Sequence, residues 1–331
     1  MFKPLRTFIG IQIILLGSFF LLACSDSVPG VERVQLNTTA AEHAAFSTTG
    51  MLALSSGAQV GIYQPNGSLA QAVNVGNPNG IWRVHWQNND ILWIYDRDQL
   101  MRFQWRSNTL DTLVHASPHS IRYVASNDSE LVIATEQQQL IRITFTPTPQ
   151  FTIMAALPHP IQSIGFIPAS VHTDEQLFAA DTRGNLYLGN INNMQNREVW
   201  RIHGAIKQVL TDTNQNLWII SNESNSPVAS TNPLSVTQIT ESDHLQKRLL
   251  SPNFTAHSFA FDGSLGVVGG SNNRWFAFHT EHSNTQTGQL GEAQNPLRQG
   301  TIAAVFIDPT KVFMITSRGE LQIWQKTRIF Q

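Results

Sequence analysis

Residues able to bind an anionic or polar group recur about every 40 positions along the sequence. Arg122, Gln162, Lys207 and His257 each stand second in an apolar-x-x-apolar pattern. Trp82 holds this second position in an earlier copy of the pattern, and Ala303 holds it in a later copy. Arg83 directly follows Trp82. Cationic and amide side chains gathered at one place can hold a carboxylate or another polar group of a partner. The alternative is that each segment begins in water and tolerates polar residues there.

The sequence contains no catalytic signature. It has no glycine-rich phosphate loop, no nucleophile elbow and no H-E-x-x-H pattern. Its histidines show no convergent set of metal ligands, so bracing of turns or solvation is favoured over metal binding. We therefore expect a protein that is not an enzyme and that uses no metal and no cofactor.

The N-terminal segment has the order of an export signal. Lys3 and Arg6 precede the apolar run 7–20, and the run ends in Leu-Leu-Ala-Cys at residues 21–24. A membrane-spanning helix needs about 20 apolar residues, so this run is too short to span comfortably. Cys24 is the only cysteine of the chain, which excludes an internal disulfide.

Residues 21–24 resemble the lipobox of bacterial lipoproteins. The resemblance implies cleavage before Cys24 and three acyl chains on that residue; the alternative is an ordinary signal with an incidental cysteine. Each buried methylene contributes about 0.8 kcal/mol, so the anchor would be effectively permanent. Ser25 stands where inner-membrane lipoproteins often carry Asp, which favours the outer membrane, facing the periplasm. We expect a signal peptide at 1–23 and a lipidated tether at 24–30, with Cys24 in the bilayer of a bacterial cell envelope.

The charge balance argues against nucleic acid as a partner. The chain has 21 Lys and Arg against 23 Asp and Glu, and the basic residues are scattered. Binding a phosphate backbone requires a concentrated basic face. Charged residues make up only 13% of the chain, and this composition suits short strands joined by turns better than surface helices.

The repeated pattern predicts seven similar units. Each begins with an apolar-x-x-apolar strand, at residues 43–46 (degenerate), 81–84, 121–124, 161–164, 206–209, 256–259 and 302–305. A nearly continuous apolar strand follows each one, at 51–54, 91–95, 131–134, 177–180, 217–220, 265–268 and 312–315. Such runs are buried on both faces. A third strand follows in most units, whereas residues 221–233 of the fifth unit are polar and predict a projecting loop.

These units resemble the WD-repeat and related propeller families, in which the third strand commonly ends in an aromatic residue such as Trp324. The turns at 182–185 and 317–320 place Gly where a positive φ is needed. The resemblance implies an all-β, seven-bladed β-propeller over residues 31–331, whose inner strands line a central channel. The last unit lacks a fourth strand, so we expect residues 31–36 to supply it and close the ring. Most of Trp82, Trp86, Trp93 and Trp105 are expected to pack between blades rather than to form an exposed recognition patch.

By analogy with propellers, we expect a membrane-anchored, non-enzymatic platform that holds another envelope protein or complex, as a scaffold or assembly factor does. One alternative is a receptor for a small ligand or glycan at the channel mouth. The other is a propeller enzyme with an unrecognised site. In each case Arg83, Arg122, Gln162, Lys207 and His257 are the candidate contact residues.

Overall fold

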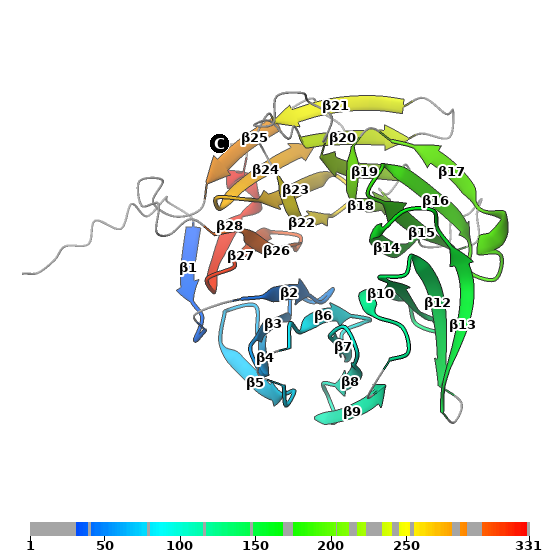
Figure 1. Cartoon of the computed structure of the whole chain (residues 1–331). Coiled ribbons are helices and arrows are strands. Elements are labelled where there is room, and N and C mark those ends of the chain that lie inside the picture. The colour runs from blue at the N-terminus through cyan, green and yellow to red at the C-terminus, as the bar shows by residue number, and fades with distance from the viewer. Residues whose placement is uncertain are drawn as a thin grey trace, which may run out of the picture.

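The apolar runs of the sequence form strands in seven four-stranded antiparallel sheets, which are arranged around a centre (Figure 1). The structure, a computed structural model, describes residues 31–329 except 39–40, 78–79, 115–116, 146–147, 168–174, 203, 212–216, 223–233, 240–244, 252–254, 280–284 and 290–299. The predicted signal peptide and tether, with Cys24, lie outside these residues. No helix in the described ranges is long and apolar enough to cross a membrane.

Each sheet is one blade of the propeller, and we number the blades one to seven from the first inner strand. The inner strands are β2 (His43–Phe46), β6 (Arg83–Trp86), β10 (Ile121–Ser126), β14 (Ile161–Ile167), β18 (Ala205–Thr211), β22 (Ala256–Phe261) and β26 (Ile302–Ile307). The second strands are β3 (Leu52–Ser56), β7 (Ile91–Tyr95), β11 (Leu131–Thr135), β15 (Gln176–Asp181), β19 (Leu217–Asn222), β23 (Leu265–Gly270) and β27 (Lys311–Thr316).

Two further strands complete each blade toward the outside. The third strands are β4 (Gln59–Tyr63), β8 (Leu100–Gln104), β12 (Gln139–Phe145), β16 (Asn185–Asn190), β20 (Leu234–Ile239), β24 (Arg274–His279) and β28 (Glu320–Gln325). The outer strands are β5 (Leu69–Asn74), β9 (Thr109–Val114), β13 (Pro149–Ala156), β17 (Glu198–Arg201), β21 (Leu245–Ser251), β25 (Thr285–Gln289) and β1 (Val31–Gln35). Two 3-10 turns follow strands, η1 (Met194–Asn196) and η3 (Lys326–Arg328).

The hydrophobic core is divided among the boundaries between neighbouring blades. One cluster joins blades one and two and contains Trp82, Trp86 and Leu92, and similar clusters join each later pair and blades seven and one. Every residue of β11 and of β23 is buried, as their continuous apolar pattern predicts. Trp82, Trp86 and Trp93 are buried, so the prediction that they belong to the core is confirmed.

The glycine turns have the predicted backbone conformation. Gly184 and Gly319 have φ values of 82° and 78° in the turns between second and third strands. In blade four the buried carboxylate of Asp181 accepts hydrogen bonds from the backbone N–H of Arg183 and Asn185 and from the Tyr187 hydroxyl. Burial opposes ionisation of Asp181, but hydrogen bonds from Asn185, Tyr187 and Arg183 lower its pKa overall. The turn is therefore fixed by its own side chains.

The outer strand of blade seven comes from the beginning of the described chain. β1 pairs antiparallel with β28, from Val31 opposite Trp324 to Gln35 opposite Glu320. Val31 therefore lies at the end of the blade where β28 finishes, and Gln35 lies at the end where the inner strands begin. Just before blade one, the backbone N–H of Ala41 donates to the Ser317 carbonyl of blade seven.

Blade five differs from its prediction in two ways. Ser221 and Asn222, expected to begin a loop, are the last residues of β19 and are buried. They pair with Ser235 and Leu234 of β20, a third strand that the sequence reading missed. The polar side chains of Ser221 and Asn222 gave no apolar strand signal. These residues still extend the strand, because pairing with strands on both sides satisfies their backbone N–H and C=O groups. The rest of the expected loop, 223–233, lies outside the described residues.

Candidate functional site at the channel mouth

Five inner strands carry a β-bulge at the same place, directly after their first buried apolar residue. The residue skipped by the pairing is Arg122, Gln162, Lys207, His257 or Ala303, in blades three to seven respectively. A bulge re-aims the extra side chain. Because neighbouring blades cover both faces of an inner strand, such a side chain reaches solvent where the inner strands begin, an end of the channel that we call the mouth. The structure thus brings these predicted residues to one level of the ring.

Arg83 joins this group from blade two, beside Arg122. It is the first residue of β6 and pairs with Tyr95 without a bulge. Its Nη1 donates to the backbone carbonyl of Arg122. The Cζ atoms of Arg83 and Arg122 lie 5.8 and 5.6 Å from the ring centroid of Tyr123. Both guanidinium groups are therefore in cation–π distance of one ring, and within the described chain neither forms an ion pair.

Lys207 brings further positive charge to the mouth from blade five, and His257 adds an imidazole from blade six. Lys207 is half-buried, and burial lowers its pKa. Partial burial and the charge of Lys207 lower the pKa of His257. The Nε2 atom of His257 lies 2.8 Å from the Ser271 hydroxyl. Among the residues that the structure describes, no carboxylate forms an ion pair with Lys207.

Gln162 adds a buried acceptor to this basic group. Its Oε1 atom is buried and accepts no hydrogen bond from any described residue, and the hydroxyl of the adjacent Ser163 is buried without a partner as well. Buried polar atoms are nearly always hydrogen-bonded, so an unpaired acceptor in a solvent-reaching site calls for a donor. A water or a ligand N–H would satisfy it.

Trp82 has the same place in the sequence pattern as Arg122, but its side chain does not reach the mouth. Its side chain is fully buried, with Nε1 donating to the Asn77 carbonyl, and the preceding Ile81 is 65% exposed. The reason is that the inner strand of blade two has no bulge. Because side chains alternate along a strand, the absence of this extra residue exchanges the buried and exposed positions at the start of the strand.

Glu42 is a mouth residue that the sequence reading missed. The degenerate apolar pattern places the first unit at 43–46, and Glu42 falls just outside it. In the structure Glu42 is exposed and directly precedes His43, which pairs with Ser55 of the second strand. In blade three the residue after Arg122 is Tyr123, and it pairs with Ala134, the equivalent position of that second strand. Glu42 therefore occupies in blade one the place that Arg122 occupies in blade three. Only the strand register could reveal this, since the apolar signal of this unit is weak.

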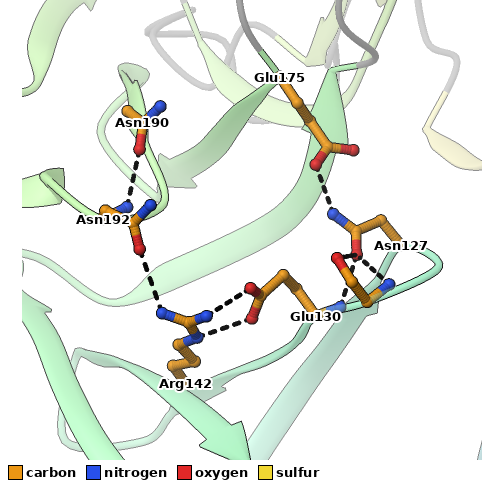
Figure 2. Close-up of polar contacts among 7 residues, drawn as sticks. Asn127, Glu130, Arg142, Glu175, Asn190 and Asn192 are labelled. Atoms are coloured by element: carbon orange, nitrogen blue, oxygen red, sulfur yellow. Dashed lines mark hydrogen bonds and ion pairs between the residues drawn. The ribbon is translucent and has the colours of Figure 1, made fainter.

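At the opposite end of the propeller, a network of polar side chains includes an ion-paired arginine. Arg142 of blade three donates from Nε to Glu130 Oε2 at 2.6 Å and from Nη1 to Asn192 Oδ1 at 3.2 Å (Figure 2). Asn127 donates to Glu175 and so joins blades three and four. This network pairs its cation with an acid, in contrast to the mouth.

The mouth therefore offers cations, donors and one buried acceptor, which is chemistry suited to binding. Within the described residues, no group of three His, Cys, Asp or Glu side chains could hold a metal ion. Its cations are Arg83, Arg122 and Lys207, with His257 as an imidazole and Glu42 as the acid at the same level.

The fold defines the chain as a seven-bladed β-propeller, similar to WD-repeat structures. The β-propeller domain of Cps50 (Swd1) from Myceliophteria thermophila has a TM-score of 0.67 and 11% identity, over 89% of this chain and 99% of that one. A chain of the mitotic checkpoint complex has a TM-score of 0.68 and 10% identity, over 89% of this chain and 90% of that one.

Propellers of other kinds are similar to the same extent. A catalytically inactive virginiamycin B lyase from Staphylococcus aureus, solved with quinupristin, has a TM-score of 0.66 and 11% identity, over 89% of this chain and 98% of that one. No protein-family model matches the chain, and no curated protein matches it by sequence. The neighbours thus include both a chain of a protein complex and a lyase, and at these identities they show the fold alone.

Proposed function

We propose that this protein is a non-enzymatic interaction platform, a scaffold or assembly factor, anchored to a membrane of the bacterial envelope through acylated Cys24. The observation that carries the proposal is the mouth, where Arg83, Arg122 and Lys207 lie at one level of the ring without an ion-paired carboxylate in the described chain. The protein as a whole has a formal net charge of −2. A cluster of cations on a protein with a negative net charge suits a partner that carries acidic groups.

The direction of β1 fits a platform that presents its mouth to a partner. Val31 lies at the end of blade seven opposite the mouth, because it pairs with Trp324 near the end of β28. A tether of residues 24–30 can reach at most about 25 Å when fully extended. Anchored through Cys24, the propeller would hold its opposite end toward the bilayer and its mouth away from it. A partner in the periplasm could then reach the mouth.

A second candidate function is the binding of a small neutral ligand, and one cleft favours it. A cavity of about 540 Å³ lies between the end of β1 and blade one. It is lined by amide and hydroxyl groups of Gln35, Asn37, Ser56 and Gln59 beside the Tyr63 ring, with no charged side chain. Such a lining suits a sugar. A thermal shift with an oligosaccharide, lost in Tyr63→Ala, would support this candidate.

The platform is tested by affinity purification after mild detergent extraction. We expect a defined envelope protein to copurify with the wild type and to be lost from the Arg122→Ala/Lys207→Ala variant. Arg106→Ala/Arg201→Ala is the matched control, since it removes equal charge from exposed positions elsewhere. Retention of every partner by the folded mouth variant would contradict the proposal. Cys24→Ala tests the anchor separately, because it should release the protein from membranes while leaving the mouth intact.

A further inference from the structure

The chemistry of the mouth also indicates what kind of partner surface it accepts. Resting on the proposed function, we infer that the mouth binds an acidic peptide segment of the partner, with carboxylates at Arg122 and Lys207 and a donor at Gln162. Three independent features of the described residues lead to this class of ligand.

The first feature is the pairing of cations elsewhere in the molecule. Arg97, Arg102, Arg142 and Lys326 each form an ion pair with a described carboxylate, at Glu136, Asp111, Glu130 and Asp262 respectively. Arg83, Arg122 and Lys207 have no such pair, and neither do Arg106 and Arg201. Arg106 and Arg201 are exposed, however, whereas Arg83, Arg122 and Lys207 are half-buried, which makes a carboxylate from outside more favourable than it would be at a fully hydrated surface.

The second feature separates a peptide from an inorganic anion. The Oε1 atom of Gln162 is a buried acceptor without a described donor. Phosphate offers few donors for this acceptor. A peptide carries carboxylates and backbone N–H groups together, so one segment can satisfy both the cations and the acceptor.

The third feature is apolar. Ile81 is 65% exposed and lies two residues before Arg83, at the rim of the mouth. It is among the few large apolar side chains that the structure leaves exposed. Contact with an aliphatic side chain of a partner would remove this surface from water, which is favourable. Neither phosphate nor a uronic acid polymer would gain from that contact.

A peptide selection tests the inference without knowing the partner. The Cys24→Ala chain, immobilised through a C-terminal tag, is panned against a phage-displayed library of random dodecapeptides. We expect enrichment of peptides that combine Asp or Glu with an aliphatic residue. Synthetic versions should bind Arg122→Ala/Lys207→Ala about tenfold more weakly. The control Arg106→Ala/Arg201→Ala should bind them unchanged.

Two further measurements define the class of ligand. Gln162→Leu, which removes the acceptor without removing charge, should weaken the same peptides severalfold, and rising salt should weaken them further. Inorganic phosphate and polygalacturonate should compete poorly, and equal competition by either would overturn the peptide class. Enriched peptides without acids that still depend on Arg122 and Lys207 would overturn the acidic class while leaving the mouth as the partner site. Binding that survives the double substitution, or no enrichment at all, would overturn the inference together with the mouth.

Discussion

The imidazole Nε2 of His85 lies 3.0 Å from the hydroxyl of Ser126, across the boundary between blades two and three. Two other residues on the same face of this chain segment make similar contacts, Arg83 to the Arg122 carbonyl and Gln87 to the Asn127 carbonyl. A row of polar side chains therefore supplements the apolar cluster at this boundary. Because the row includes a buried imidazole, it also makes the boundary sensitive to pH.

Stability should fall with decreasing pH because of His85. Burial lowers the pKa of His85 from 6.5 to about 4. The unfolded chain therefore binds more protons than the folded chain between these values, so the stabilisation is complete above the window and is lost as the pH falls through it. The loss is about 3 kcal/mol at most. His85→Gln, which keeps a hydrogen-bonding group but cannot titrate, should flatten melting temperature against pH.

His43 should contribute to the same pH dependence. Burial and the charge of Arg83 lower its pKa to about 4. His85→Gln should therefore reduce the acid sensitivity without abolishing it, and His43→Gln/His85→Gln should reduce it further. Unchanged acid sensitivity in the double variant would show that other groups control it.

Lys207 offers a test of whether the mouth is kept for binding at some cost to stability. Burial lowers the pKa of Lys207, and its charge faces His257. Lys207→Gln should therefore leave the free energy of unfolding unchanged or raise it by about 0.5 kcal/mol, while weakening partner binding. Urea denaturation measures the first effect and the pull-down the second. A clear loss of stability would instead indicate a structural role for this side chain.

The turn of blade four depends on Gly184. Its φ is 82°, and an added Cβ would lie 2.2 Å from the Ile202 carbonyl oxygen. We expect Gly184→Ala to destabilise the protein by about 3 kcal/mol, from backbone strain and the clash together. Gly76 is the control, because its φ is 83° and nothing lies within 4 Å of the added Cβ. Gly76→Ala should cost only about 1 kcal/mol. Equal losses in urea denaturation would contradict this reasoning.

The outer strand of blade seven should be required for stability. Removal of residues 31–36 would leave β28 without its partner and take Leu36, which is 3% exposed, out of the cluster between blades seven and one. We expect a lower melting temperature and lower solubility, because an unpaired edge favours aggregation. Removal of residues 24–30 alone is the control. Wild-type melting of the longer deletion would show that β1 is dispensable for the ring.

The proposed anchor predicts the orientation of the propeller on a bilayer. Two exposed residues of blade seven mark its two ends. Thr327 follows β28 at the end opposite the mouth, and Arg318 lies in the turn before β28, at the mouth end. With Cys24 acylated, a fluorophore on Thr327→Cys should transfer energy to labelled lipid more efficiently than one on Arg318→Cys. The reverse order would contradict the orientation. Absence of vesicle binding by both would contradict the anchor instead.

The sequence alone was enough to predict the architecture, because its main signals are local. Four or five consecutive apolar residues, as at 131–134, require burial on both faces, and their regular return requires stacked units. Gly184 and Gly319 mark turns because other residues rarely adopt a positive φ. The positions of Arg122, Gln162, Lys207 and His257 in one frame were also readable, since the first apolar residue of each strand precedes them.

Only the tertiary structure decided what surrounds those residues. The bulges that re-aim them, and the missing bulge that buries Trp82 and exposes Ile81, depend on register with a second strand. Glu42 entered the mouth for the same reason. The approach of Arg83 to Arg122 joins residues 39 positions apart, and such a contact arises only when two blades pack together. Local patterns determine which segments become strands, whereas the charge balance of the site follows from pairing and packing between segments distant in the sequence.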